Sequence, residues 1–205
     1  MSRRPPAKLS RRKASRATRP LVTVFCEGKN TEPDYILAFA KDCGVKVHIE
    51  SVVGTPATLV DAAAVLRKSK LRKTSDSYGR NDPIWVVFDC DEHPYIDQAF
   101  DKAQGNGIGV AFSNPCIEVW AFLHFEDHDK PLHRHEMQRE LERVMPSFKA
   151  NKSKRFDIAL MRPGYRAADE RAERMEQRRR DQGDPKGNPY TSMFLLTRLI
   201  TQGGR

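Results

Sequence analysis

Three acidic residues stand directly after apolar runs, where carboxylates are well placed for metal-assisted chemistry. Glu27 follows the run 21–26, and Asp89 and Asp91 follow the run 83–88 on alternate residues. Both runs are apolar and rich in β-branched residues, which predicts two buried strands. Alternate residues of a strand point to one side, and ligands of open α/β sheets bind beyond the carboxyl ends of the strands. If the two strands are neighbours, the three carboxylates meet at one edge of the sheet.

Carboxylates that meet in this way repel each other, and a divalent cation removes the repulsion. Mg²⁺ prefers oxygen ligands and keeps several waters, so two or three carboxylates are enough to hold it. Such an ion can activate water and stabilise charge on a phosphoryl group. The alternative is that these acids are simply solvated at strand ends, because a lone D-x-D motif is weak. Acids after both of the most apolar strands favour a Mg²⁺ or Mn²⁺ site.

Further candidates have a chemical and a structural interpretation that the sequence leaves open. His93 is either a proton shuttle near the metal or a surface residue. Glu118 is either a further metal ligand or a structural acid of a helix. The nucleic-acid-binding candidates are basic residues that either grip phosphates or are solvated, namely Lys29, Lys149, Lys152, Lys154 and Arg155.

The first 20 residues contain eight basic residues and no acid, so almost all of the net charge of +9 lies there. We expect residues 1–19 to form a disordered basic tail, which is either a phosphate-seeking arm or a solubilising extension. No run approaches the roughly 20 apolar residues of a membrane helix. The four cysteines have no zinc-finger spacing, which favours a reducing, cytoplasmic location.

The order of the predicted elements indicates an α/β fold with a mostly parallel sheet and flanking helices. We expect an α/β core over residues 20–126 and a C-terminal helical region over 127–205 that packs on it. The pattern predicts strands over 21–26, 45–49, 83–88 and 107–112, and helices over 31–43, 58–73, 95–104, 116–125, 133–144, 166–180 and 190–200. The helix at 166–180 is expected to be charged all round.

Four motifs together resemble the RloB-like protein family. Residues 26–35 match a C-E-G-x-x-T-E-x-x-Y pattern, and residues 87–93 read V-F-D-C-D-E-H. Residues 113–125 are similar to an S-N-P-C-F-E-x-W-x-x-x-H-F block, and residues 188–191 to a closing N-P-x-T. The motifs follow one another in the family's order.

The resemblance implies a Toprim-like fold, in which a Glu after the first strand and a later D-x-D bind Mg²⁺. Carried over, these residues are Glu27, Asp89 and Asp91, with Glu27 as general acid/base or metal ligand. Cys90 stands where the family often has Arg, which puts a phosphate contact from that position in doubt. The family's association with anti-phage and abortive-infection systems implies a defence role.

Two functions follow as hypotheses. The first is a metal-dependent nuclease or phosphodiester-processing enzyme that acts on DNA or RNA, with tRNA included. The second is a non-catalytic module that binds nucleic acid or a partner protein within a defence complex. The chain has no G-x-x-x-x-G-K-[ST] loop, so any ATPase is expected to be a separate partner protein.

Overall fold

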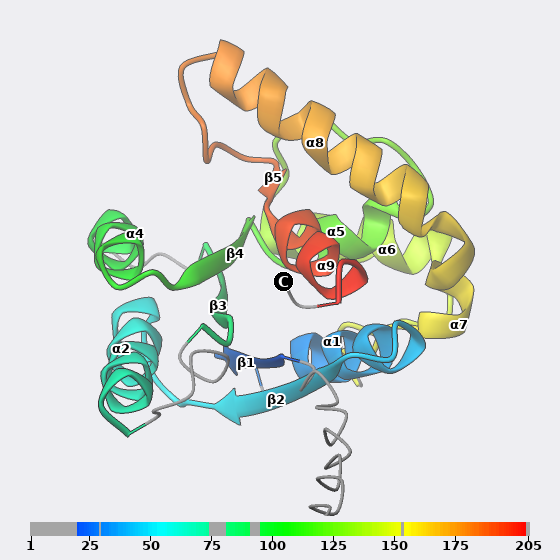
Figure 1. The fold of residues 1–205 in the computed structure, drawn as a ribbon. Coiled ribbons are helices and arrows are strands. Elements are labelled where there is room, and N and C mark those ends of the chain that lie inside the picture. The colour runs from blue at the N-terminus through cyan, green and yellow to red at the C-terminus, as the bar shows by residue number, and fades with distance from the viewer. Residues whose placement is uncertain (1–19, 29, 74–80, 91–94, 153, 204–205) are drawn as a thin grey trace, which may run out of the picture.

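A five-stranded sheet with the order β2-β1-β3-β4-β5 forms the centre of the molecule (Figure 1). The computed structural model describes residues 20–28, 30–73, 81–90, 95–152 and 154–203. The strands are β1 Leu21–Cys26, β2 Lys46–Ser51, β3 Ile84–Asp89, β4 Gly109–Asn114 and β5 Tyr190–Thr191. The first four strands are parallel to one another, and β5 pairs with β4 in the antiparallel direction.

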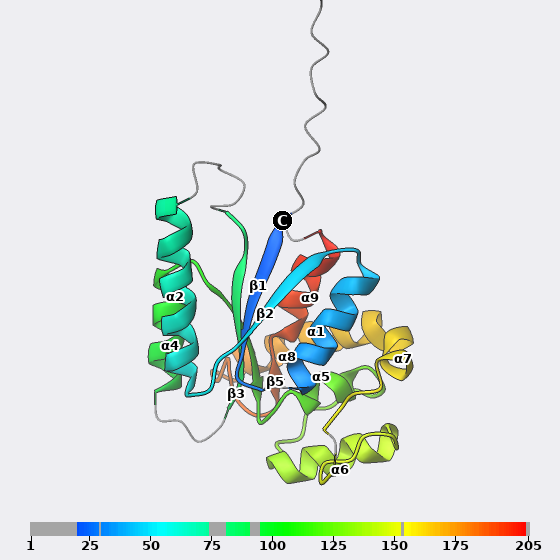
Figure 2. The same ribbon diagram turned by 90° about the horizontal axis from the view of Figure 1, so that it is seen from below.

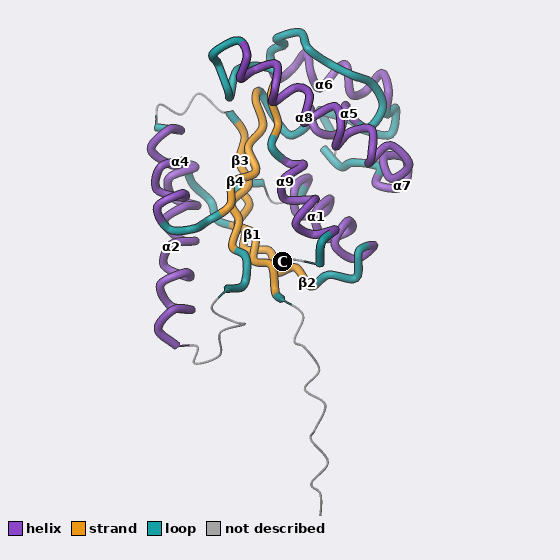
Figure 3. Tube along the Cα trace, turned by 45° about the horizontal axis from the view of Figure 1, so that its top comes forward, coloured by secondary structure: helices purple, strands orange, loops and turns teal. Residues whose placement is uncertain are grey.

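Helices cover both faces of this sheet (Figures 2 and 3). Helices α2 and α4 lie on one face, and α1, α5 and α9 lie on the other, with α6 and α8 beyond them. The helices are α1 Thr31–Asp42, α2 Pro56–Lys73, α4 Ile96–Gly105, α5 Glu118–Leu123, α6 Arg134–Val144, α7 Ile158–Met161, α8 Tyr165–Asp181 and α9 Met193–Thr201; the short 3-10 helix η1 spans Arg162–Gly164.

The central strands are apolar throughout because both of their faces are covered. In β3, Val86 and Phe88 pack in the core beneath α2 and α4, whereas Val87 packs in the core on the other face. Phe25 and Cys26 of β1 divide between the two cores in the same way. The unbroken apolar runs that predicted buried strands therefore place side chains in the cores on both faces of the sheet.

The α/β fold with a mostly parallel sheet, flanking helices and a helical C-terminal region is confirmed. The segment 116–125 contains α5, as its helical spacing predicted. No helix within the described ranges is long and apolar enough to cross a membrane.

The prediction of a continuous helix over 190–200 was wrong at its beginning. Tyr190 and Thr191 form β5, and α9 begins at Met193. The hydroxyls of Thr191 and Ser113 lie 3.0 Å apart, and the backbone amide of Ser192 donates to the carbonyl of Phe112 at 2.8 Å. The spacing of apolar residues does not show that the first two residues of this run can pair with the edge strand β4.

The expectation that the helix at 166–180 is charged all round was also wrong. One side of α8 buries Ala168, Ala172, Met175 and Arg179, which recur at intervals of three or four residues. Alanine contributes little to a hydrophobic pattern, and Arg179 is accommodated because it forms an ion pair with Asp129. The helix consequently packs against α5 and α9.

Two neighbouring leucines of α9 test whether the C-terminal helix belongs to the core. Leu196 is fully buried, whereas Leu195 is 40% exposed. We expect Leu196→Ala to lower the free energy of unfolding by about 2 to 5 kcal/mol, because a buried cavity results. Leu195→Ala is the matched control and should change it by no more than about 0.5 to 1 kcal/mol. Equal effects in urea unfolding would contradict the placement of α9.

Candidate functional site

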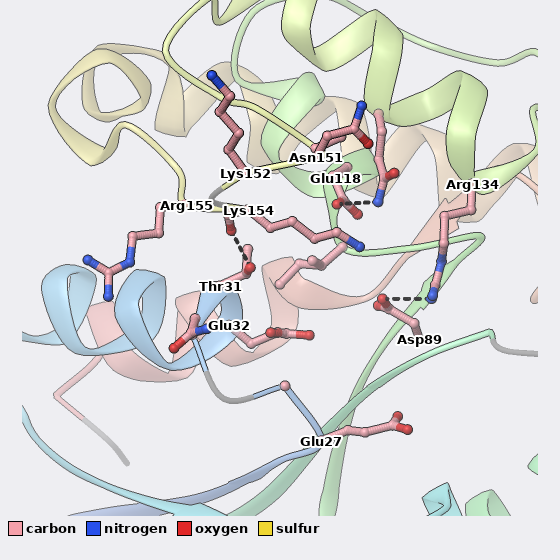
Figure 4. Close-up of a pocket in the computed structure, with 15 residues that line it drawn as sticks. Glu27, Thr31, Glu32, Asp89, Glu118, Arg134, Asn151, Lys152, Lys154 and Arg155 are labelled. Atoms are coloured by element: carbon pink, nitrogen blue, oxygen red, sulfur yellow. Dashed lines mark hydrogen bonds and ion pairs between the residues drawn. The ribbon is translucent and has the colours of Figure 1, made fainter.

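A cavity of about 660 Å³ opens where β1 and β3 end, between the sheet and the C-terminal region (Figure 4). Four acids line it, and they come from the sheet and from two helices: Glu27, Glu32, Asp89 and Glu118. Four basic residues line the same cavity from the C-terminal region: Arg134, Lys152, Lys154 and Arg155. Acidic and basic residues therefore line one common cavity.

The parallel pairing of β1 and β3 accounts for the position of the first two acids. Cys26, the last residue of β1, lies beside Val87, and the amide of Glu27 donates to the carbonyl of Val87 at 3.4 Å. Asp89 is the last residue of β3. The strands are neighbours, and the carboxylates of Glu27 and Asp89 line the same cavity.

Three predicted site residues, Lys29, Asp91 and His93, lie outside the described residues, and so does the tail over 1–19. Within the described ranges, no group of three or more His, Cys, Asp or Glu side chains is arranged to hold a metal ion. Carboxylate oxygens are nevertheless the ligands that Mg²⁺ prefers, and one or two of them suffice when phosphate oxygens and waters complete the shell. Glu27 and Asp89 fit that requirement chemically.

Glu32 is an acid of the cavity that the sequence analysis did not select. It stands in the first turn of α1, and its carboxylate lies over Gly28, where a β-carbon would collide with it. Burial raises the pKa of Glu32, and the negative charges of Glu118 and Glu27 raise it further. The positive charge of Arg134 lowers this pKa in part. Glycine at position 28 thus leaves room for a carboxyl group that holds a proton more readily than usual.

Helix α6 brings two polar side chains to the acids. Arg134 Nη2 donates to Asp89 Oδ2 at 3.3 Å, and Gln138 Nε2 donates to Glu118 Oε1 at 3.0 Å. Residues four positions apart lie on one side of a helix, so Arg134 and Gln138 face the cavity together. Glu118 is only 4% exposed, and its bond to Gln138 satisfies part of its hydrogen-bonding capacity.

The position of α6 is fixed by its first turn and by a distant motif. His133 caps the helix, and its amide donates to Glu136 Oε2 at 2.9 Å in a capping box. The side chain of Asn188 accepts from the amide of Leu132 at 3.3 Å and donates to the carbonyl of Leu132 at 2.8 Å. The N-P-Y-T segment therefore holds the chain that leads into Arg134.

The basic segment over 149–155 is bound to the start of α1. The hydroxyl of Thr31 donates to the carbonyl of Lys154, and Arg155 Nε lies 3.4 Å from Asp34 Oδ2. Lys154 extends over the cavity, whereas Lys152 and Arg155 point outward from its rim (Figure 4). Lys149 is exposed and does not line the cavity. Of the five predicted basic residues, three line the cavity, Lys149 does not, and Lys29 lies outside the described residues.

Sequence reasoning missed Glu32, Arg134 and Gln138 for two different reasons. Glu32 belongs to the C-E-G-x-x-T-E-x-x-Y motif, so a signal existed in the motif itself. Arg134 is separated from Asp89 by 45 residues, and nothing in its local sequence distinguishes it from other arginines of a polar helix. Only the packing of α6 reveals its role.

Comparison with known proteins identifies one family. A family model described as RloB-like protein matches residues 22–200, which is most of the chain. Neither a curated protein nor a solved structure matches it.

The raised pKa of Glu32 predicts a pH-dependent stability. When the folded-state pKa of a carboxyl group is raised, the folded protein favours the protonated form. The contribution of that group to the free energy of unfolding is therefore present in acid and is lost as the pH rises through the folded pKa. Without divalent cations, Glu32→Gln should therefore melt at a higher temperature than the wild type at neutral pH. This gain should shrink as the pH falls into the acidic range.

Glu170→Gln is the control for this measurement, because Glu170 lies on the exposed side of α8 outside the cavity. It should show no comparable gain in melting temperature. A pH-independent difference between Glu32→Gln and the wild type would contradict the raised pKa.

Proposed function

The chain belongs to the RloB-like protein family, and from this premise we propose that it is a metal-dependent nuclease or phosphodiester-processing enzyme. Its substrate is DNA or RNA, with tRNA included, and the cavity at the ends of β1 and β3 is the active site. The observation that carries the proposal is that four acids and four basic residues line that one cavity. A phosphodiester needs both, since its charge must be bound and its hydrolysis requires groups that accept and donate protons.

In this proposal the basic residues bind and orient the nucleic-acid backbone. Lys152 and Arg155 point outward and are suited to phosphates that flank the reacting one, while Lys154 extends over the cavity. Arg134 offers a planar guanidinium, which can donate two parallel hydrogen bonds to a phosphate. These contacts are independent of base identity and position the strand without selecting a sequence.

The acids carry the proton transfers and hold the cation. Glu27 and Asp89 would hold Mg²⁺ or Mn²⁺, which supplies stabilisation of charge on the phosphoryl group when bound. In hydrolysis a water oxygen bonds to phosphorus while the bond to the leaving oxygen breaks. In this proposal Glu27 would accept the proton of the water if it is not itself a metal ligand, and Glu32, with its raised pKa, is suited to return a proton to the leaving oxygen.

The setting that we propose is an anti-phage defence system of the abortive-infection type, as the resemblance implied. The chain has no phosphate-binding loop of the G-x-x-x-x-G-K-[ST] form, so an ATPase would be a separate partner. A nuclease in such a system must be held inactive until infection, which gives a partner of this kind a purpose.

A second candidate is a module that binds nucleic acid or a partner and cuts nothing. The observation in its favour is that the described residues include no ready group of three metal-ligating side chains. The two candidates differ in one respect, because the enzyme requires a divalent cation at Glu27 and Asp89 whereas the binding module does not.

Cleavage assays with Asp89→Asn test the enzyme directly. We expect the protein to cut at least one member of a panel of plasmid DNA, single-stranded DNA, total RNA and tRNA with Mg²⁺ or Mn²⁺, in the presence of its neighbouring gene product. Asp89→Asn keeps the shape of the side chain and removes its charge, so cleavage should fall at least about a hundredfold. Binding of Mn²⁺, measured by calorimetry, should weaken in parallel.

Asp101→Asn is the matched control, because Asp101 is exposed on α4 and does not line the cavity. It should cleave and bind Mn²⁺ like the wild type. If nothing is cut although nucleic acid binds, the binding module is the correct function. If Asp89→Asn cuts as fast as the wild type, the cavity is not the active site.

The salt dependence of binding tests the basic rim. Each phosphate contact on duplex DNA contributes about −0.9 to the slope of log affinity against log salt concentration. Replacement of Lys152, Lys154 and Arg155 by Ala together should make this slope shallower by about 2 to 3 and weaken binding at low salt. Lys149→Ala, a control from the same segment, should change the slope by less than one contact. Equal slopes for all variants would remove the rim from the nucleic-acid interface.

A further inference from the structure

Strand β2 forms an edge of the sheet, and within the described part of the chain it has a strand neighbour on one side only. Figure 2 looks onto this edge, and no helix crosses in front of β2 there. The strand has six residues, Lys46–Ser51, and contains no proline. An edge strand of this length presents a row of amides and carbonyls to which another strand can bind.

The hydrogen bonds around β1 show which backbone groups of β2 point outward. The amide of Val52 donates to the carbonyl of Cys26, so the backbone of Glu50 and Val52 faces β1 on either side of Ser51. Alternate residues of a strand direct their backbone groups to opposite sides. The amides and carbonyls of Val47, Ile49 and Ser51 therefore point away from the sheet.

The sequence of β2 is complementary to itself when two copies pair antiparallel about His48. When two copies pair about His48, Lys46 of one copy lies opposite Glu50 of the other, and Val47 lies opposite Ile49. Val47 and Ile49 then exchange backbone hydrogen bonds, because both direct their amides and carbonyls outward. Centring the pair on Glu50 would instead place two glutamates face to face, which is unfavourable.

The side chains of β2 suit this pairing on both faces of the sheet. Val47 and Ile49 are half-buried against the core of the sheet, so a second copy would extend that apolar face. Lys46, His48 and Glu50 are exposed on the opposite face, where His48 Nε2 lies 2.9 Å from Glu50 Oε1. No acid among the described residues forms an ion pair with Lys46, which leaves its ammonium available to Glu50 of a second copy.

We infer that the protein forms a homodimer by antiparallel pairing of β2 with β2 of a second copy, in the register centred on His48. The two sheets join into one continuous sheet across a twofold axis. Because the strands run in opposite directions, the two cavities open at opposite ends of this sheet. Dimer formation is therefore independent of the chemistry at either cavity.

Charge reversal on β2 tests this inference with full-length protein. Sedimentation velocity and light scattering should show a dimer for the wild type. Lys46→Glu places Glu opposite Glu50 in both symmetry-related pairs, and Glu50→Lys places Lys opposite Lys46. Each variant should weaken dimerisation about tenfold or more. The double variant K46E/E50K restores opposite charges and should dimerise like the wild type.

The two single variants provide the sharpest result when they are mixed. A K46E chain and an E50K chain are complementary at both pairs, so the mixture should form a heterodimer at concentrations at which each variant alone is monomeric. Lys68→Glu is the control, because Lys68 is exposed on α2 and carries the same charge. Lys46→Glu should retain the cleavage rate per chain of the wild type, which separates a failure of this inference from a failure of the proposed function. A monomeric wild type, persistent dimers of both single variants, or a mixture that stays monomeric would each overturn the inference.

Discussion

Electrostatic repulsion among carboxylates is the constraint on which the architecture of the cavity depends. Parallel pairing of β1 with β3 places Glu27 and Asp89 at one edge of the sheet, and α1 and α5 add Glu32 and Glu118. Burial raises the pKa of Glu32, and the negative charges of Glu118 and Glu27 raise it further, as expected for carboxylates that share a partly buried space. The surrounding structure compensates with Arg134 at Asp89 and with an amide from Gln138 at Glu118.

The C-terminal region provides Arg134 and Gln138. Its attachment to the sheet fixes the position of these two side chains at the acids. Strand β5 joins the sheet beside β4, and α9 packs in the same core as α1 and α5. Asn188 binds both backbone groups of Leu132 and so links the end of the chain to the start of α6. Thr31 and Asp34 hold the basic segment from the other side of the cavity. The basic residues are thus held by contacts to the same elements that carry the acids.

Local patterns in the sequence were sufficient to predict the four parallel strands and to place Glu27 and Asp89 at the ends of two of them. Apolar runs of six residues identified β1 and β3, and the acids after them followed from the direction of parallel strands. The same rules could not place Arg134, because its partner Asp89 lies 45 residues earlier and only the docking of α6 joins them. They also failed at β5, where two residues of an apolar run pair with β4 instead of entering the helix. These two errors therefore lie in long-range pairing, which no local pattern encodes.

Under the proposed function, the Asp89–Arg134 ion pair couples binding of the cation to binding of the substrate. A divalent cation at Asp89 and the guanidinium of Arg134 both neutralise the same carboxylate, so each weakens the other's electrostatic attraction to it. A phosphate that enters the cavity attracts both, because its oxygens can ligate the cation and accept hydrogen bonds from Arg134. If Asp89 holds a cation, substrate would favour a rearrangement in which Arg134 turns from Asp89 to the phosphate. Cation and substrate would then bind cooperatively, and by thermodynamic linkage each would raise the affinity of the other by the same factor.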